Sequence, residues 1–501
     1  MDLFQNLALG FDVALQGQNL LYCFIGVLLG TLIGVLPGLG PLATISMLLP
    51  ITFGLPPISA LIMLAGIFYG SQYGGSTTAI LLNLPGESSS VVTALDGYQM
   101  ARQGRAGAAL ATAALGSFFA GTVGTVLIAV LAPPLAAVAL KFGPAEYFSL
   151  MLLGLVIAVV LASGSMLKAL AMVVLGILLG LAGQDINTGA FRFTFGIPQL
   201  ATGFDFLALS MGVFGIGEII KNLETSGPRQ VMASHVGRLL LTREEWKRVI
   251  APILRGTGIG SVLGILPGGG AVLASFVSYT VEKRVSKTPH EFGKGMIEGV
   301  AGPESANNAG AQTSFIPMLT LGIPSNPVMA LMIAALILQG IQPGPNVMTA
   351  RPELFWGIIA SMWIGNLLLV ILNLPLVGIW VRILTIPYRY IVPAIGVLCC
   401  IGVFSVENNP ADVLMMGVFG LVGYLLLKLD CEPAPLLLGF IIGPLLEENL
   451  RRAMLIARGD WSTFVTRPLS AGLLLISLLA LIAVMSPMLR RKREEAFQDG
   501  A

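Results

Sequence analysis

Two similar stretches decide the fold of this chain: GTLIGVLPGLG, from Gly30 to Gly40, and GSVLGILPGGG, from Gly260 to Gly270. Each places a Pro-Gly-x-Gly interruption inside a strongly apolar run. Proline removes a backbone donor and glycine adds conformational freedom, so we expect helix breaks at Pro37 and Pro267. Such a break strands backbone groups, and a bilayer tolerates it only where protein or water surrounds it.

The rest of the chain has the composition of a membrane protein. Of its 501 residues, 55% are hydrophobic and 11% are charged, with a mean hydropathy of +0.86, whereas soluble domains carry about 25% charged residues. Apolar runs long enough for membrane helices lie at 20–36, 106–131, 147–161, 356–377 and 469–488. The sequence predicts an all-α polytopic membrane protein with roughly 10 to 12 spans of about 20 residues each. No Lys or Arg precedes the first apolar segment, so we expect it to be retained rather than cleaved as a signal peptide.

The cysteines and the net charge indicate no further class. Cys23, Cys399, Cys400 and Cys431 lack the spacing of a zinc site or a disulfide framework. We interpret them as packing residues and expect no structural metal. The net charge of +2 gives no indication of nucleic-acid binding.

Basic residues predict the orientation of the chain. The segment from Lys221 to Arg255 is rich in Lys and Arg, which places it in the cytoplasm by the positive-inside rule. No Lys or Arg precedes Arg102, which places the N-terminus outside. Basic residues flank the last apolar run on both sides, and we favour a cytoplasmic tail at 490–501 because its four basic residues are contiguous.

A second pair of motifs indicates an internal duplication. STTAILLNLPGESS begins at Ser76 and TSFIPMLTLGIPSN begins at Thr313, in the same order as the first pair. Two motifs in one order favour two membrane repeats, 1–220 and 256–489, joined by the linker 221–255. The residues are compatible with inverted or parallel repeats. We expect inverted repeats with broken or re-entrant helices, as in many secondary transporters.

The repeated motifs carry the candidate binding residues. Freed N–H groups at a helix break can hold a carboxylate, and unwound carbonyls can hold a cation. Each Ser or Thr hydroxyl in these motifs is also explained as the donor of a hydrogen bond to a carbonyl oxygen of its own helix. We assign substrate or ion binding to Gly38, Gly40, Ser76, Thr77, Asn83, Pro85, Gly86, Ser88, Gly268, Gly270, Thr313, Ser314, Thr320, Gly322, Pro324, Ser325 and Asn326.

Charge near these motifs points to a coupling ion. No Lys or Arg occurs in 1–101 or 295–350, so an anion bound there would depend on neutral donors and on a co-bound cation. We favour sodium over a proton because hydroxyl and carbonyl oxygens dominate the motifs. Glu87 and Glu304 are candidates for charge coupling if they lie within the membrane, and ordinary interfacial residues if they do not.

These motifs resemble a known family. GVLPGLGPL, YGGSTTAILLNLPGESSS and GVAGPESANNAGAQTSFIPMLTLGIPSNPVMALM are similar to segments of the large membrane subunit of the bacterial tripartite tricarboxylate transporters, the TctA type. The resemblance implies a permease of the bacterial inner membrane that works with a small four-span membrane subunit and a periplasmic substrate-binding protein. It also implies ion-driven import of a small carboxylate such as citrate. A homo-oligomer is compatible with it.

Other functions are less compatible with the residues. An ATP-driven pump would need a Gly-x-x-x-x-Gly-Lys-Ser/Thr string, which is absent from the sequence. A passive anion channel remains the alternative among transport proteins, since broken helices also line pores. An intramembrane serine hydrolase would need a base, but His235 and His290 lie in polar segments away from the motifs.

Overall fold

The computed structural model describes residues 3–36, 40–84, 86–162, 165–185, 188–224, 239–266, 270–383 and 388–485. The predicted break residues Pro37, Gly38, Pro85, Pro267 and Gly268 lie outside these ranges. The helices on either side of these residues are described.

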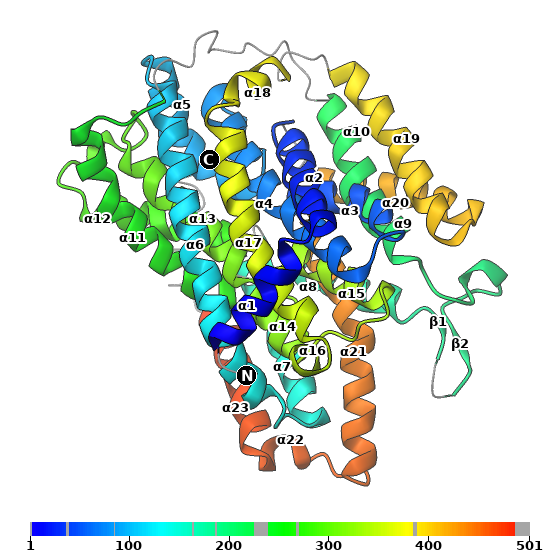
Figure 1. Cartoon of the computed structure of the whole chain (residues 1–501). Coiled ribbons are helices and arrows are strands. Elements are labelled where there is room, and N and C mark those ends of the chain that lie inside the picture. Colours follow the sequence, from blue (N-terminus) through cyan, green and yellow to red (C-terminus); the bar gives the residue numbers. More distant parts are fainter. Residues whose placement is uncertain are drawn as a thin grey trace.

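The described chain is almost entirely helical (Figure 1). Its first part contains α1 (Leu3–Ala14), α2 (Gly17–Gly34), α3 (Pro41–Leu48), η1 (Leu49–Thr52), α4 (Pro57–Leu82), η2 (Ser88–Ser90), α5 (Val91–Arg102), α6 (Ala106–Ala139), α7 (Pro144–Leu161), α8 (Met166–Gly180), η3 (Pro198–Leu200), α9 (Phe206–Ser210), η4 (Met211–Ile216) and α10 (Gly217–Glu224). Its second part contains α11 (Arg243–Ile265), α12 (Gly270–Val285), η5 (Pro289–Glu291), α13 (Glu298–Thr313), α14 (Phe315–Leu321), α15 (Pro327–Leu338), α16 (Asn346–Ala350), α17 (Pro352–Asn373), α18 (Val377–Ile383), α19 (Tyr388–Glu407), α20 (Pro410–Lys428), α21 (Ala434–Ile456), α22 (Thr463–Thr466) and α23 (Pro468–Met485). One antiparallel pair, β1 (Gly183–Gln184) with β2 (Phe191–Arg192), projects from the helices.

The apolar helices confirm the predicted membrane class. Among the described residues, α2, α6, α11, α17 and α20 are long and apolar enough to cross a membrane. Shorter apolar helices include α7, α8, α15 and α23. The predicted apolar runs coincide with α2, α6, α7, α17 and α23. The count of 10 to 12 spans stays a prediction.

Glycines bring two pairs of helices into backbone contact. A Cβ on Gly30 of α2 would lie 2.3 Å from the carbonyl oxygen of Ile67 in α4, and a Cβ on Gly260 of α11 would lie 2.2 Å from that of Ala306 in α13. Only glycine permits so close an approach, as in small-residue helix contacts of membrane proteins. The contacts recur every four residues, at Gly26, Gly30 and Gly34 of α2 and at Gly256, Gly260 and Gly264 of α11.

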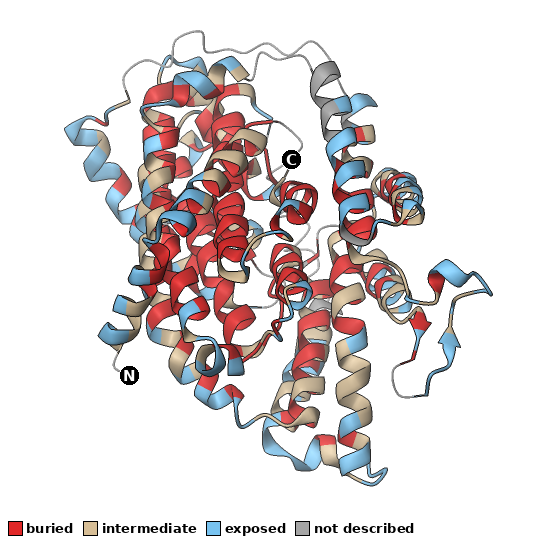
Figure 2. Cartoon of the chain, turned by 45° about the vertical axis from the view of Figure 1, so that its right-hand side comes forward, coloured by how far each residue is buried: buried red, intermediate tan, exposed pale blue. Residues whose placement is uncertain are grey.

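The partner helices α4 and α13 form the buried centre of the molecule (Figure 2). Helix α4 is buried continuously from Ser59 to Leu81, and α13 from Gly299 to Thr313. Whereas α4 is mostly apolar, α13 has the sequence EGVAGPESANNAGAQT. Its enclosure therefore places a set of polar side chains in the interior, where each must find a partner or a ligand.

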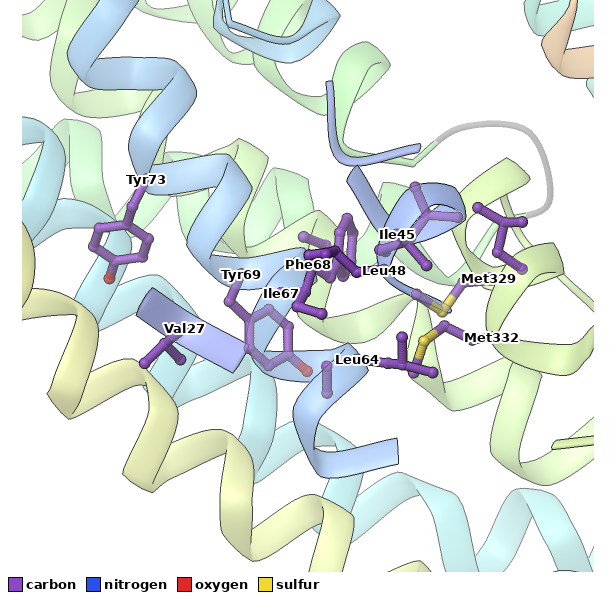
Figure 3. Close-up of a cluster of buried hydrophobic side chains, with 14 of the residues drawn as sticks. Val27, Ile45, Leu48, Leu64, Ile67, Phe68, Tyr69, Tyr73, Met329 and Met332 are labelled. Carbon is purple, nitrogen blue, oxygen red and sulfur yellow. The ribbon is translucent and has the colours of Figure 1, made fainter. Parts of the chain in front are cut away.

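An apolar cluster beside α4 joins the two predicted repeats (Figure 3). Leu64, Ile67 and Phe68 of α4 lie among side chains from α3 and α15, including Met329 and Met332. Phe315 at the start of α14 packs against Phe68 and Tyr69, with ring centroids 6.3 Å and 5.8 Å apart. This cluster packs α4 against α14 and α15 of the second predicted repeat.

Ion pairs tie helix ends together at the two ends of the molecule. Arg105, just before α6, pairs with Glu245 of α11 at 2.9 Å, and Arg248 pairs with Glu298 of α13 at 2.7 Å. Arg467 pairs with Glu146 at 2.6 Å near the other end of α6. The end of α5 lies at the top of Figure 1 and α22 at the bottom. Residues 243–255 of the predicted linker form the first half of α11.

Candidate functional site

In the STTAILLNLPGESS motif, α4 extends to Leu82 and η2 begins at Ser88. The segment between these two helices is called the first break. Asn83 ends α4 in the left-handed conformation, with φ of 56°, and Glu87 occupies the N-cap position of η2. A Cβ on Gly86 would lie 2.4 Å from the Cα of Gly75 and 2.6 Å from the carbonyl oxygen of Gly34. The break is therefore packed inside protein, against the end of α2, as an interruption at membrane depth requires.

The second break is the matching segment between α14, which extends to Leu321, and α15, which begins at Pro327. It too follows a helix that ends in the left-handed conformation. Gly322 ends α14 with φ of 70°, and the Asn326 side chain accepts a hydrogen bond from the backbone N–H of Met329 at 3.0 Å, capping α15. Ser325 Oγ donates to the carbonyl oxygen of Ser314 at 3.2 Å, and Asn326 Nδ2 donates to Ser314 Oγ at 3.0 Å. These bonds satisfy groups that the break would otherwise leave unpaired.

An ungapped alignment of the two motifs, with Ser76 opposite Thr313, differs by two residues from the register in which the two helix ends match. That alignment pairs Asn83 with Thr320, whereas the left-handed helix ends pair Asn83 with Gly322. The same shift of two residues pairs Pro85 with Pro324 and the N-cap residue Glu87 with Asn326. Hydroxyl residues misled the ungapped alignment because they recur throughout both motifs, whereas the helix ends are set by geometry. The first repeat thus places a carboxylate where the second has a neutral amide.

Glu304 lies where helices of the two predicted repeats meet, and its side chain is fully enclosed. Only 1% of this α13 residue is exposed. Ser76 Oγ of α4 donates to its Oε2 at 2.7 Å, and the Thr93 hydroxyl of α5 donates to its Oε1. One turn further along α13, Asn308 Nδ2 donates to Ser117 Oγ of α6 at 2.6 Å. Four helices therefore meet around one buried carboxylate.

Glu87 forms a second buried carboxylate group beside the first. Ser89 Oγ donates to its Oε1 at 2.5 Å, and Asn307 Nδ2 of α13 donates to the same oxygen at 3.1 Å. Ser89 Oγ also lies 3.2 Å from Gln72 Oε1 of α4. The break after α4 is thus bonded directly to the polar helix of the second repeat, and Glu87, at 7% exposure, is shielded from solvent.

Neither carboxylate has a cationic partner among the described residues. The ion pairs of the described chain involve other acidic residues, and 1–101 and 295–350 contain no Lys or Arg at all. Burying an unpaired carboxylate costs several kcal/mol, roughly, even after relaxation. Two such groups in contact with neutral donors are the arrangement expected of a proton or cation pathway rather than of a purely structural core.

The remaining predicted residues divide between buried and exposed positions. Thr77, Thr313 and Thr320 are buried and donate to carbonyl oxygens of their own helices, at 3.2, 2.9 and 2.7 Å. Asn83 and Ser88 are exposed at the first break. Gly40 and Gly270 begin the helices that follow the Pro-Gly-x-Gly motifs, and a Cβ on Gly270 would lie 3.5 Å from Cβ of Asn326. Buried Pro324 lies in the second break.

Some residues of this interior were not predicted. Thr93, Ser117 and Asn373 each reach the surroundings of Glu304 from a helix outside the motifs. Their only signal in the sequence is a polar side chain in an apolar segment, which does not say what it faces. Asp96 was also missed; its Oδ1 accepts hydrogen bonds from three backbone N–H groups, those of Gly293, Gly295 and Met296, at 2.8 to 2.9 Å.

The fold and this interior define a polytopic membrane transport protein with buried, uncompensated carboxylates between broken helices. Residues 20–438 match the model of the tripartite tricarboxylate transporter TctA family, and the chain belongs to that family. The family is one of transporters, not of enzymes, and its members work in three-component systems with TctB and TctC partners.

Two curated relatives come from Agrobacterium vitis. One is an uncharacterized 52.8 kDa protein in the TAR-I ttuC' 3'region, 63% identical over 499 residues that cover 100% of this chain and 99% of the relative. The other is an uncharacterized protein in the TAR-II ttuC' 3'region, 66% identical over 240 residues that cover 48% of this chain and 99% of the relative. No solved structure gives a significant match.

Proposed function

We propose that this chain is the large membrane subunit of an ion-driven importer for small organic carboxylates, delivered by a periplasmic binding protein. The observation that carries the proposal is the enclosure of α13, a polar helix, against α4 in the middle of a membrane protein. Polar residues at that depth are costly, and they mark ion and substrate pathways. A structural scaffold would have no need of Glu87 and Glu304 there.

The proposed substrate site lies at the first break rather than between α4 and α13. Asn83 and Ser88 are exposed beside the non-helical backbone of the first break. Polar residues beside non-helical backbone favour a water-filled path over lipid. The N–H groups before α5 would bind the carboxylate of the substrate, and Ser325 and Asn326 would serve the matching role before α15.

Orientation follows from the basic end of the molecule. Arg102, Arg105, Lys247 and Arg248 lie at helix ends joined by the Arg105–Glu245 and Arg248–Glu298 pairs. By the positive-inside rule this end would face the cytoplasm, together with the linker 221–255, whose basic residues predict the same side. The membrane would be the inner membrane of a bacterium. The binding protein would then dock at the opposite end, near α22 and the loop before α7.

Uptake by the reconstituted system tests the function. Proteoliposomes would contain the chain and its small membrane subunit, with the binding protein and radiolabelled citrate added outside. We expect saturable uptake under an inward sodium gradient and none after the gradient is collapsed. Uptake that continues without any ion gradient would favour the passive channel, and no uptake under either a sodium or a proton gradient would refute ion-driven citrate import.

Variants at the break locate the substrate site. Asn83→Ala and Ser88→Ala should raise the half-saturating citrate concentration by about tenfold, the equivalent of one lost hydrogen-bonding group. Thr280→Ala is the matched control, because this exposed hydroxyl of α12 bonds only to the Phe276 carbonyl of its own helix. Equal effects in all three variants would contradict the assignment.

A further inference from the structure

A small cavity lies beside Glu304 where α4, α6, α13 and α17 meet. Its volume is about 10 Å³, close to the space that one water molecule or one dehydrated small ion needs. Its polar lining comes from Tyr73, Ser76, Thr77, Ser117, Glu304 and Asn373. A citrate-like molecule is far larger than this cavity, so the cavity is not the substrate site.

The lining offers more acceptors than donors. The Ser76 and Thr77 hydroxyls already donate, to Glu304 Oε2 at 2.7 Å and to the Tyr73 carbonyl at 3.2 Å, so that toward the cavity they offer lone pairs. Asn373 is 97% buried, since its exposure is 3%. Its Nδ2 donates to the Leu369 carbonyl at 2.9 Å, and its Oδ1 has no hydrogen-bond partner.

The Glu304 carboxylate and the unpartnered Asn373 Oδ1 line the same cavity, and a positively charged ligand would stabilise both. A buried acceptor without a donor costs about 1–3 kcal/mol, and an uncompensated carboxylate costs more. None of the described residues that line the cavity is basic. A cation would satisfy the carboxylate, the amide oxygen and the hydroxyl lone pairs together.

We propose that this cavity binds one dehydrated monovalent cation of the size of sodium, held by oxygens of Ser76, Thr77, Ser117, Glu304 and Asn373. All five ligands are oxygens, which suit hard cations. One carboxylate on the cavity balances a single positive charge, whereas a divalent ion would leave an excess charge in the interior. The inference rests on the proposed function, for which this cation would be the coupling ion.

The ligands also explain how binding would be linked to movement. Ser76, Thr77 and Ser117 belong to the first predicted repeat, and Glu304 and Asn373 belong to the second. The cation would therefore join α4 to α13 and α17 across the repeat interface. Asn307, about one turn after Glu304 on α13, donates to Glu87 at the first break. The charge of the bound ion would therefore also act on the break that carries the proposed substrate site.

Equilibrium binding of radioactive sodium to the purified chain tests the site without any carboxylate or partner. We expect saturable binding of one ion per chain in a scintillation proximity assay. Glu304→Gln should abolish it, and Asn373→Ala and Ser117→Ala, which keep the carboxylate, should each weaken it by about tenfold. Sodium should also raise the thermal midpoint of the wild type and not that of Glu304→Gln, since a ligand stabilises only the state that binds it.

The control is Glu448→Gln, which removes an exposed carboxylate that pairs with Arg452 at the far end of α21. It should bind sodium as the wild type does. Wild-type affinity in Glu304→Gln or in both Asn373→Ala and Ser117→Ala, or no sodium binding by the folded wild type, would overturn the proposal. Sodium binding with the expected variant pattern but without citrate uptake would keep the site and reject the proposed function instead.

Discussion

The contact between α11 and α13 predicts opposite outcomes for two alanine substitutions that lie half a turn apart. A Cβ on Gly260 would meet the Ala306 carbonyl oxygen at 2.2 Å, at least 0.8 Å closer than the 3.0 Å below which real Cβ contacts essentially do not occur. The helices must separate locally, which forfeits packing over the neighbouring turns. A Cβ on Gly258 would meet nothing within 4 Å.

We expect Gly260→Ala to lower the free energy of unfolding by about 1–3 kcal/mol, the usual cost of overpacking. Gly258→Ala should be neutral or stabilising by up to about 1 kcal/mol, because alanine is the better helix former. The first repeat offers the same test at Gly30, where the Cβ would lie 2.3 Å from the Ile67 carbonyl oxygen. Gly258→Ala and Gly260→Ala make the same chemical change on the same helix, so a difference in helix propensity cannot account for a difference between their stabilities.

Unfolding in mixed micelles at increasing dodecyl sulfate, followed by circular dichroism and tryptophan fluorescence, measures the difference. Size-exclusion chromatography after heating gives an independent midpoint. Equal stability of Gly258→Ala and Gly260→Ala would show that α11 and α13 do not approach each other as closely as described. A more stable Gly260→Ala would refute the helix contact outright.

Two further predictions concern single side chains that fasten the interior. Asp96→Ala should destabilise the fold by about 2 kcal/mol or more, since three backbone N–H groups in residues 293–296 lose their acceptor. Limited proteolysis should then cut the loop at 293–296 faster. Unchanged cleavage would contradict the role of Asp96 in holding this loop. Asn326→Ala should lower the free energy of unfolding by about 0.5–2 kcal/mol, because α15 loses its N-cap. Asn326→Ser should recover part of this stability in the same unfolding assay. An alanine variant as stable as the wild type would exclude a stabilising role for the cap.

The membrane class could be predicted because it follows from local composition, whereas the breaks at Pro37 and Pro267 stay predictions. The scarcity of charge predicts the class, and five apolar runs coincide with helices. The Gly-x-x-x-Gly spacing at Gly30 and Gly34 is typical of a close contact between helices. The described residues show the contact, and Pro37 itself lies outside them.

The interior of the site depends on contacts that the sequence does not encode locally. Helix α13 contains three glycines, two asparagines and Pro303, which are poor helix formers, and its burial between α4, α6 and α11 supports the helix despite them. Glu304 was predicted as a candidate, but its neighbours Thr93, Ser117 and Asn373 come from positions far away in the chain. Their convergence is a property of the packing of four helices, which one sequence without comparison cannot supply.

An experimental density map of the subunit in lipid nanodiscs tests the central claim most directly. It should show α4 ending at Asn83, α14 ending at Gly322, and α13 enclosed against α4 with the Glu304 carboxylate within hydrogen-bonding distance of Ser76 Oγ. A continuous helix through residues 83–91, or lipid between α4 and α13, would contradict the account.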